Sequence, residues 1–333
     1  MFRIFGPPGT GKTTKLLNLV DKHLEAGVEP TNIAFLAFTR KAAEEARERA
    51  AARFNLDPKQ DLFFFKTLHS LALSMTDIRT DQVMQPEHYR ELGNAIGVSL
   101  HSEKTNRFSD IPETQKSSDP VLGLINLAIL RKVPLRTQYN ISRIDESWNV
   151  VKYVDEALTK YKKSYNLYDF TDMLRVFAET GESCCPRFAV TFLDEAQDLS
   201  PLQWDIAHML DRRSEKMYCA GDDDQAIYRW AGADVEHFIG LEGGSETLSQ
   251  SYRVPELPWE IAQNIARRIH RRFPKTYKPR EEKGFVTRIS MINELDLSEG
   301  SWLILAQAAY LLQDVSSDLK AMGLLFTFRG HRS

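Results

Sequence analysis

Near the N-terminus, residues 6–13 read Gly-Pro-Pro-Gly-Thr-Gly-Lys-Thr, a complete match to the pattern G-x-x-x-x-G-K-[ST]. The apolar run 2–5 before it predicts a strand, and residues 14–20 after it predict a helix. Glycines let a backbone curl so that successive N–H groups point at an anion, and a helix N-terminus adds partial positive charge. A chance glycine turn would not bring this strand and helix with it. The sequence therefore predicts a site for a nucleoside triphosphate.

Two side chains of this loop have expected roles. Lys12 is expected to reach the β- and γ-phosphates, and the Thr13 hydroxyl to hold Mg²⁺. The residues expected to surround the phosphates are Gly6, Pro7, Pro8, Gly9, Thr10, Gly11, Lys12, Thr13 and Thr14.

The length, composition and charge of the chain limit the classes of protein to which it can belong. The chain has 333 residues, which suggests about two domains, and 42% hydrophobic with 27% charged residues is typical of a folded globular protein. The net charge is −3, so a nucleic-acid contact would need a local basic groove. The three cysteines have neither a disulfide nor a zinc spacing, and no apolar run is long enough to span a membrane. These features favour a protein of the reducing cytoplasm.

Apolar runs typical of buried parallel strands occur in two separate parts of the chain. Residues 33–38 and 62–65 predict strands in the first part, and residues 188–193 and 216–220 in the second. Between them, from about residue 75 to 165, helical segments separated by polar stretches predict a helical insertion. The expected helices there are 86–96, 121–131 and 148–163, and the polar stretches include 102–119. Residues 286–289 and 302–306 predict two further strands, and 308–320 a helix that the segment 324–328 follows. The expected fold class is α/β with a parallel sheet.

Asp194 and Glu195 directly follow the predicted strand 188–193. Ligands of open α/β sheets bind at the carboxyl ends of the strands, where these acids are expected. Asp194 is the expected partner of Mg²⁺, and Glu195 the base that polarises the attacking water. The alternative is that both carboxylates only complement the dipole of a following helix. The phosphate loop argues against it, because such a loop needs an acidic metal partner.

Residues 221–233 combine three aspartates with a glutamine and two aromatics. Gln225 could sense a γ-phosphate from the end of the preceding strand. Tyr228 and Trp230 offer faces on which bases of a single strand can stack, although both rings could instead belong to the core. A helix is expected from 258 to about 272, and its basic run 267–272 is more often solvated than bound to nucleic acid.

Other polar residues carry weaker signals. Thr39 is the expected N-cap of a helix over 40–54, and Thr39, Arg40 and Lys41 could equally hold a phosphate backbone. His69 has no evident nucleophile to serve, and a lone histidine there is more often structural. Arg253 could be an arginine finger, and Tyr252 could stack on a base.

Together these motifs resemble those of the UvrD/Rep-type superfamily 1 DNA helicases. Their order and spacing carry the resemblance, which covers most of residues 1–255. The matching segments are 6–14 (motif I), 37–43 (Ia), 67–70 (Ib), 169–174, 194–198 (II), 221–233 (III) and 251–253 (IV).

The resemblance implies a discontinuous RecA-like domain over 1–75 and 166–247, a helical subdomain over 76–165, and a partial second RecA-like domain over 248–333. It implies ATP and Mg²⁺ as cofactors, and a monomer that moves 3′→5′ on single-stranded DNA and unwinds junctions. Lys12, Glu195, Gln225 and Arg253 are the implied catalytic residues, with Tyr252 at the ATP cleft. The implied DNA contacts are Phe38, Thr39, Arg40, His69, Tyr228 and Trp230.

Three departures from the family pattern stand out. Only five residues precede Gly6, so an adenine-reading glutamine motif is missing, and Ala231 replaces the arginine usual after the motif III tryptophan. Motifs V and VI, expected after Phe328, are absent, so we expect a truncated chain or a split gene with slow hydrolysis. A non-catalytic DNA-binding module and an RNA-directed helicase remain as alternatives, and the biological pathway stays open between repair, replication, recombination and phage functions.

Overall fold

The computed structural model describes residues 1–101, 119–306 and 309–327. Their contacts form two compact units, residues 1–282 and residues 283–333. The polar stretch noted at 102–119 lies, apart from Asp119, outside the described residues. None of the described helices is long and apolar enough to cross a membrane.

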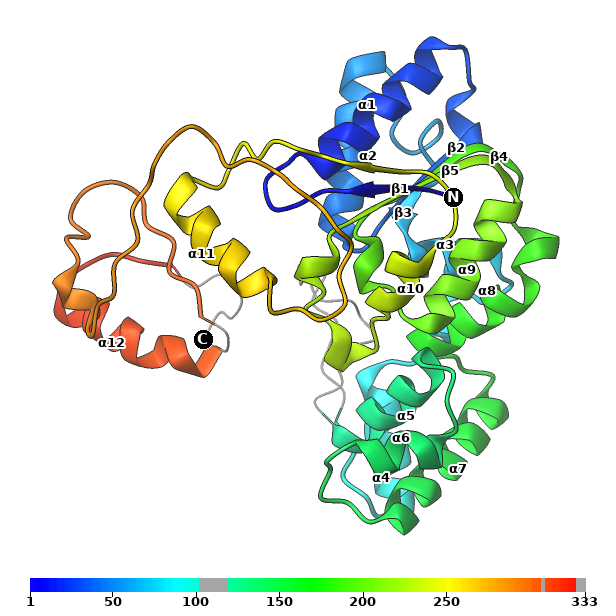
Figure 1. Ribbon diagram of the computed structural model, residues 1–333. Helices are drawn as coiled ribbons and strands as arrows, with labels where there is room; N and C mark the ends of the chain where they lie inside the picture. The colour runs from blue at the N-terminus through cyan, green and yellow to red at the C-terminus, as the bar shows by residue number, and fades with distance from the viewer. Residues whose placement is uncertain (102–118, 307–308, 328–333) are drawn as a thin grey trace. The chain divides into compact units, whose positions relative to one another are not determined.

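A six-stranded parallel sheet organises the first unit (Figure 1), with the strand order β3-β2-β4-β5-β1-β6. The α/β fold with a parallel sheet is thus confirmed. The strands are β1 (Phe2–Phe5), β2 (Ile33–Ala37), β3 (Phe65–Thr67), β4 (Phe188–Leu193), β5 (Ser214–Gly221) and β6 (Ser245–Thr247). Every residue of β2 is buried, which explains its uninterrupted apolar sequence. β1 and β4 both pair with β5 in parallel. The phosphate loop after β1 and the acid pair after β4 therefore lie at the same edge of the sheet, where the strands end.

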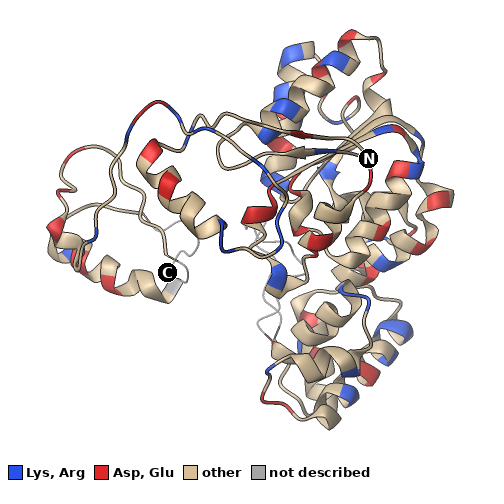
Figure 2. Ribbon diagram, in the orientation of Figure 1, with Lys and Arg blue, Asp and Glu red and all other residues tan. Residues whose placement is uncertain are grey.

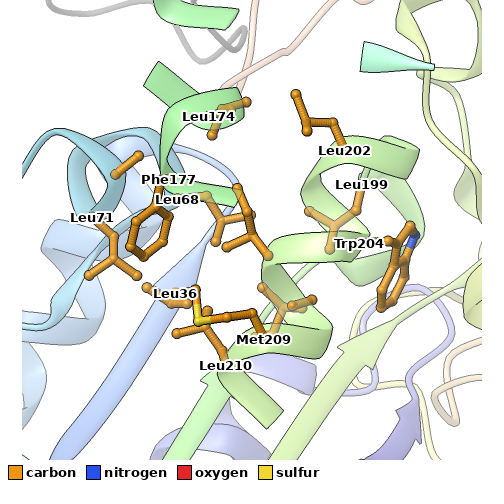
Figure 3. Packing of buried hydrophobic residues seen from close by; sticks show 14 of the residues in the cluster. Leu36, Leu68, Leu71, Leu174, Phe177, Leu199, Leu202, Trp204, Met209 and Leu210 are labelled. Atoms are coloured by element: carbon orange, nitrogen blue, oxygen red, sulfur yellow. The ribbon is translucent and has the colours of Figure 1, made fainter. Parts of the chain in front are cut away.

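Helices cover both faces of this sheet. α1 (Lys12–Glu25) and α2 (Arg40–Phe54) pack on the face formed by Ile33, Phe35 and Ala37. The opposite face, which includes Leu36, is covered by α3 (Leu68–Met75), α8 (Phe170–Cys184) and α9 (Pro201–Arg212), as Figure 3 shows. α10 (Val235–Gly240) adds Phe238 to that core. Successive side chains of β2 therefore point to opposite faces of the sheet and pack into two different cores, as expected for a strand.

The expected helical insertion is present and has a core of its own. It contains α4 (Pro86–Ile96), α5 (Pro120–Leu130), α7 (Trp148–Tyr165) and α6 (Leu135–Ile141), of which α6 was not predicted. At its end, the buried Lys162 ammonium lies 2.5 Å from Asp169 and 2.7 Å from Asp172. Asp169 is also the N-cap of α8 and accepts the Asp172 N–H at 2.8 Å. This ion cluster fixes the corner between α7 and the core helix α8.

Two boundaries in the first unit were predicted wrongly. Residues 62–64 form a turn, and β3 begins only at Phe65, because the Phe65 N–H bonds the Leu62 carbonyl and both side chains enter one core. The helix expected over 258–272 is α11 (Glu256–Ala266). Beyond its end the chain is bound to the turn after β5, where Arg272 makes two hydrogen bonds to Asp224 and the Phe273 N–H donates to Asp223 at 2.7 Å.

The second unit contains α12 (Leu312–Ala321), close to the helix expected over 308–320. The strands expected at 286–289 and 302–306 are irregular, and so are residues 324–327, with 328 outside the described residues. A strand is held by hydrogen bonds to a neighbouring strand, and the described residues of this unit pair with none. An apolar run alone was therefore an insufficient signal.

Candidate nucleotide and nucleic-acid sites

The loop 6–11 joins β1 directly to α1, and two of its glycines are required by geometry. Gly11 is the N-cap of α1 with φ 80°, and no side chain caps the first turn. A Cβ on Gly6 would lie only 1.9 Å from Lys12 Cγ, so the loop closes around the lysine stem. The first-turn N–H groups and the Lys12 ammonium are thereby gathered at one place, as an anion site requires.

The Lys12 ammonium lies at the centre of this loop. It donates a hydrogen bond to the Gly6 carbonyl at 3.1 Å and lies 3.8 Å from Glu195 Oε2. Lys12, which is expected to reach the phosphates, thus lies close to Glu195, the expected base.

Thr13 and Asp194 meet across the sheet edge. The Thr13 hydroxyl donates to Asp194 Oδ2 at 2.8 Å, although 181 positions separate them in the chain. Burial and then the Glu195 charge raise the pKa of Asp194 to about 6, against the opposing effects of Thr13 and Lys12. A hydroxyl and a carboxylate are hard oxygen ligands, so the pair fits Mg²⁺, which would in turn favour the ionised carboxylate.

Glu195 has a left-handed backbone, with φ 54°. Such a conformation is costly for a residue with a side chain and clusters at functional sites. Its backbone N–H donates to Asp194 Oδ1 at 3.0 Å, and its Oε2 accepts from Gln197 Nε2 at 2.9 Å. Gln197 lies within motif II (194–198), but sequence reasoning gave it no role.

Gln225 lies after β5 on the short turn Asp223–Gln225. Its side chain donates to Asp222 Oδ2 at 2.5 Å, and the Asp222 N–H donates to Gln197 Oε1 at 3.0 Å. The expected sensor is therefore connected to the acid pair through Asp222.

A buried cation secures the same turn. Lys275 Nζ lies 3.2 Å from Asp222, 2.5 Å from Asp223 and 2.9 Å from Asp224. Although burial opposes it, the three aspartates, Asp222 first, hold the pKa of Lys275 above its usual value. Sequence reasoning missed Lys275, because a single lysine 51 positions beyond Asp224 carries no local signal.

Phe38, Tyr228 and Trp230 form an aromatic cluster at the ends of β2 and β5. The Phe38 and Tyr228 ring centroids are 5.5 Å apart, and those of Tyr228 and Trp230 are 6.4 Å apart. Trp230 is 63% exposed, so it is not a core residue. Thr39 caps α2 by accepting the Ala42 N–H at 3.2 Å, as expected. The cluster presents faces of a kind that stacks on bases.

The turn that carries Trp230 is supported from the insertion. Arg131, just after α5, donates to the Arg229 carbonyl at 2.9 Å. Ala231, where the family usually has arginine, is buried.

His69 lies at the start of α3. Burial and then the nearby Arg40 charge lower the pKa of His69 to about 4, so its ring is neutral at pH 7. The ring lies 6.3 Å from that of Phe170, and its Nε2 is buried without a hydrogen-bond partner among the described residues. Basic and acidic residues are interspersed on the helices of this unit, as Figure 2 shows, so a nucleic-acid contact would depend on local groups.

Residues 251–253 run beside the phosphate loop. The Ser251 hydroxyl donates to the Pro8 carbonyl at 2.7 Å, and the Tyr252 N–H donates to the Gly9 carbonyl at 2.9 Å. A Cβ on Gly9 would lie 2.4 Å from Arg253 Cβ. The exposed side chains of Tyr252 and Arg253 thus flank the loop, and both residues belong to the unit of residues 1–282.

A parallel sheet with this loop after β1 and this threonine–aspartate contact at β4 defines a nucleoside-triphosphate-binding protein of the P-loop class. Residues 2–243 match the family model described as the UvrD/REP helicase N-terminal domain, and the chain belongs to this helicase family.

Curated relatives agree with this assignment. The chain is 26% identical over 298 residues to "ATP-dependent DNA helicase PcrA" of Leuconostoc citreum, covering 84% of this chain and 39% of that protein. It is 28% identical over 286 residues to "Putative ATP-dependent DNA helicase YjcD" of Bacillus subtilis, covering 80% and 36%. It is 26% identical over 253 residues to "ATP-dependent DNA helicase Rep" of Buchnera aphidicola, covering 72% and 38%. The chain thus spans less than half the length of these relatives.

Proposed function

We propose that this chain binds ATP with Mg²⁺, hydrolyses it, and couples hydrolysis to 3′→5′ movement along single-stranded DNA and to unwinding at junctions. The contact between Thr13 and Asp194 carries the proposal, because it joins the phosphate loop after β1 to an acid at the end of β4. The printed names of the relatives, which are ATP-dependent DNA helicases, support the same reaction.

The proposed division of roles follows the geometry. Thr13 and Asp194 hold Mg²⁺, which would neutralise charge on the phosphates, and Lys12 exchanges its Gly6 contact for a phosphate oxygen. Glu195 accepts a proton from the attacking water. Gln225 and Arg253 act at the γ-phosphate.

The remaining residues bind the base and the strand. Tyr252 stacks on the adenine beside the loop. The DNA contacts are Phe38, Thr39, Arg40, His69, Tyr228 and Trp230. We further propose that residues 1–75 with 166–247, 76–165, and 248–333 are the three structural parts, and that the protein acts as a cytoplasmic monomer.

Paired variants test the nucleotide roles. Lys12→Ala should abolish tight binding of a fluorescent ATP analogue, whereas Glu195→Gln should bind it normally and release no phosphate. Lys15→Ala is the matched control, because Lys15 lies on the same helix and pairs with Glu246 at 2.8 Å. If Glu195→Gln hydrolyses ATP at the wild-type rate, Glu195 is not the base. If Lys12→Ala binds the analogue as tightly as the wild type, the phosphate loop is not the nucleotide site.

Competition separates the nucleic-acid classes. Unlabelled single-stranded DNA should displace a labelled DNA oligonucleotide more effectively than RNA of the same sequence does, and RNA would win if the chain were RNA-directed.

A further inference from the structure

Two histidines from different helices face each other away from the phosphate loop. His208 lies on α9 and His237 on α10, and their Nε2 atoms are 2.7 Å apart, although 29 positions separate the residues in the chain. Both residues are half-buried, and their ring planes meet at 66°. When both rings are neutral, one Nε2–H donates to the lone pair of the other Nε2.

The His237 ring is held by the core of this unit. It stacks on the Trp204 ring, with the centroids 4.7 Å apart and an angle of 27° between the planes. Trp204 is buried, and its Nε1 donates to the Asp234 carbonyl at 3.3 Å. The Asp234 carboxylate accepts the backbone N–H of His237 at 3.2 Å and so caps α10. The ring is therefore positioned by groups other than His208.

The charges around the two rings favour a cation. Asp205 lies three positions before His208 on α9, so the two side chains share a side of the helix, where Lys132 also pairs with Asp205 at 2.5 Å. Burial, and then the nearby His208, lower the pKa of His237. The charges of Asp234 and Asp205 oppose this shift. A neutral ring keeps a lone pair that can bind a metal ion.

The spacing of the two nitrogens suits a ligand that both can share. Zn²⁺ binds histidine nitrogens at about 2.0–2.1 Å with tetrahedral geometry, which places two such nitrogens about 3.3 Å apart. The rings would need to separate by only about 0.6 Å from their present distance. Within the described parts of the chain, no three histidine, cysteine, aspartate or glutamate side chains form a metal-binding group. Two histidine nitrogens completed by water are therefore the ligand set that these residues offer.

We propose that His208 and His237 bind one Zn²⁺ ion through their Nε2 atoms, and that the ion fastens α10 to α9. The ring that donates in the present pair shifts its hydrogen from Nε2 to Nδ1 through water, so both Nε2 lone pairs face the ion and both rings stay neutral. Imidazole suits Zn²⁺, whereas the oxygen ligands of Thr13 and Asp194 suit Mg²⁺. The inference is therefore independent of the proposed function.

Isothermal titration calorimetry with Zn²⁺ on the whole chain at pH 7.5 tests the site, with Mg²⁺ in excess to occupy sites made of oxygen ligands. We expect one Zn²⁺ to bind per wild-type chain. His208→Gln and His237→Gln each keep a side chain that can hydrogen-bond to the remaining histidine but remove one nitrogen ligand. Each should bind Zn²⁺ at least about tenfold more weakly, since even the loss of a group that only orients a ligand costs that much.

Thermal unfolding separates loss of the ion from loss of packing. With Zn²⁺ at about one hundred times its dissociation constant, the wild-type midpoint should rise by roughly 5–11 °C. At the same Zn²⁺ concentration, the midpoint of either glutamine variant should rise at most about half as much. Without Zn²⁺, both variants should melt close to the wild type, because glutamine retains a hydrogen bond across the pair.

His270→Gln and Cys184→Ser are the matched controls. His270 and Cys184 are exposed, so each could bind Zn²⁺ without forming part of a built site. Neither change should alter the zinc affinity or the rise of the midpoint.

A wild-type chain that binds no Zn²⁺ would overturn the inference, and so would wild-type affinity in His208→Gln and His237→Gln. Loss of zinc binding in Cys184→Ser or His270→Gln would overturn it too, by placing the ion elsewhere. If one histidine variant does not fold, the other decides the question, because each removes one of the two ligands. All of these outcomes leave the proposed nucleotide site in place, since it uses other residues.

Discussion

The charge cluster around Lys275 gives the sharpest stability prediction. The side chains of Lys275, Asp222 and Asp223 have no exposed surface, and that of Asp224 is 13% exposed. Lys275→Met keeps most of the volume but leaves three buried carboxylates without their shared cation. Removing one partner of a buried ion pair costs about 3–5 kcal/mol. Arg272 still pairs with Asp224 at 2.6 Å, so we expect the lower end of that range.

Thermal unfolding followed by circular dichroism at pH 7.5 measures this loss. Each kcal/mol shifts the midpoint by about 2–4 °C in a unit of this general size, so the midpoint should fall by roughly 6–12 °C. The deficit should shrink as the pH is lowered toward about 5. Carboxylates that are buried without a cation have raised pKa values, so the folded variant takes up protons that its unfolded chain does not.

Lys278→Met is the matched control. Lys278 is exposed three residues further on, and within the described part of the chain only its backbone forms hydrogen bonds, with its N–H donating to the Ser249 carbonyl at 2.8 Å. The control should melt with the wild type. If Lys275→Met also melts within about 2 °C of the wild type, the lysine charge does not hold the aspartates and the reasoning fails.

Three further variants test the site. Trp230→Ala should weaken single-stranded DNA binding in fluorescence anisotropy by about 1–3 kcal/mol without lowering the melting temperature, and unchanged affinity would exclude stacking. Burial raises the pKa of Asp198 to about 7, so its stabilising protonated form is lost as the pH rises through that value. Between pH 5.5 and 7.5 the wild type should therefore lose roughly 2 kcal/mol relative to Asp198→Asn in denaturant unfolding, and parallel pH profiles would refute this. Gly9→Ala should impair nucleotide binding more than Gly27→Ala does. Both glycines have positive φ, but only Gly9 faces Arg253, and equal effects would show that backbone strain alone matters.

Local patterns predicted much of the candidate site. The apolar runs located β1, β2, β4 and β5, because strands buried on both faces need uninterrupted apolar sequence. Parallel strands end at a common edge, so the meeting of Thr13 with Asp194 followed from the positions of the loop and the acid pair. Thr39 was a predictable cap because an N-cap hydrogen bond spans only a few residues.

The sequence by itself therefore determined the phosphate loop, the parallel sheet around it and the acids that face it. The tertiary structure decided how Gln197 reaches Asp222 and how Lys275 neutralises three aspartates. It also decided which apolar runs became strands, since residues 286–289 and 302–306 did not. The physical reason is common to all three. A hydrogen bond, a buried ion pair and a strand ladder each need a partner brought close by the whole fold, and no local pattern names that partner.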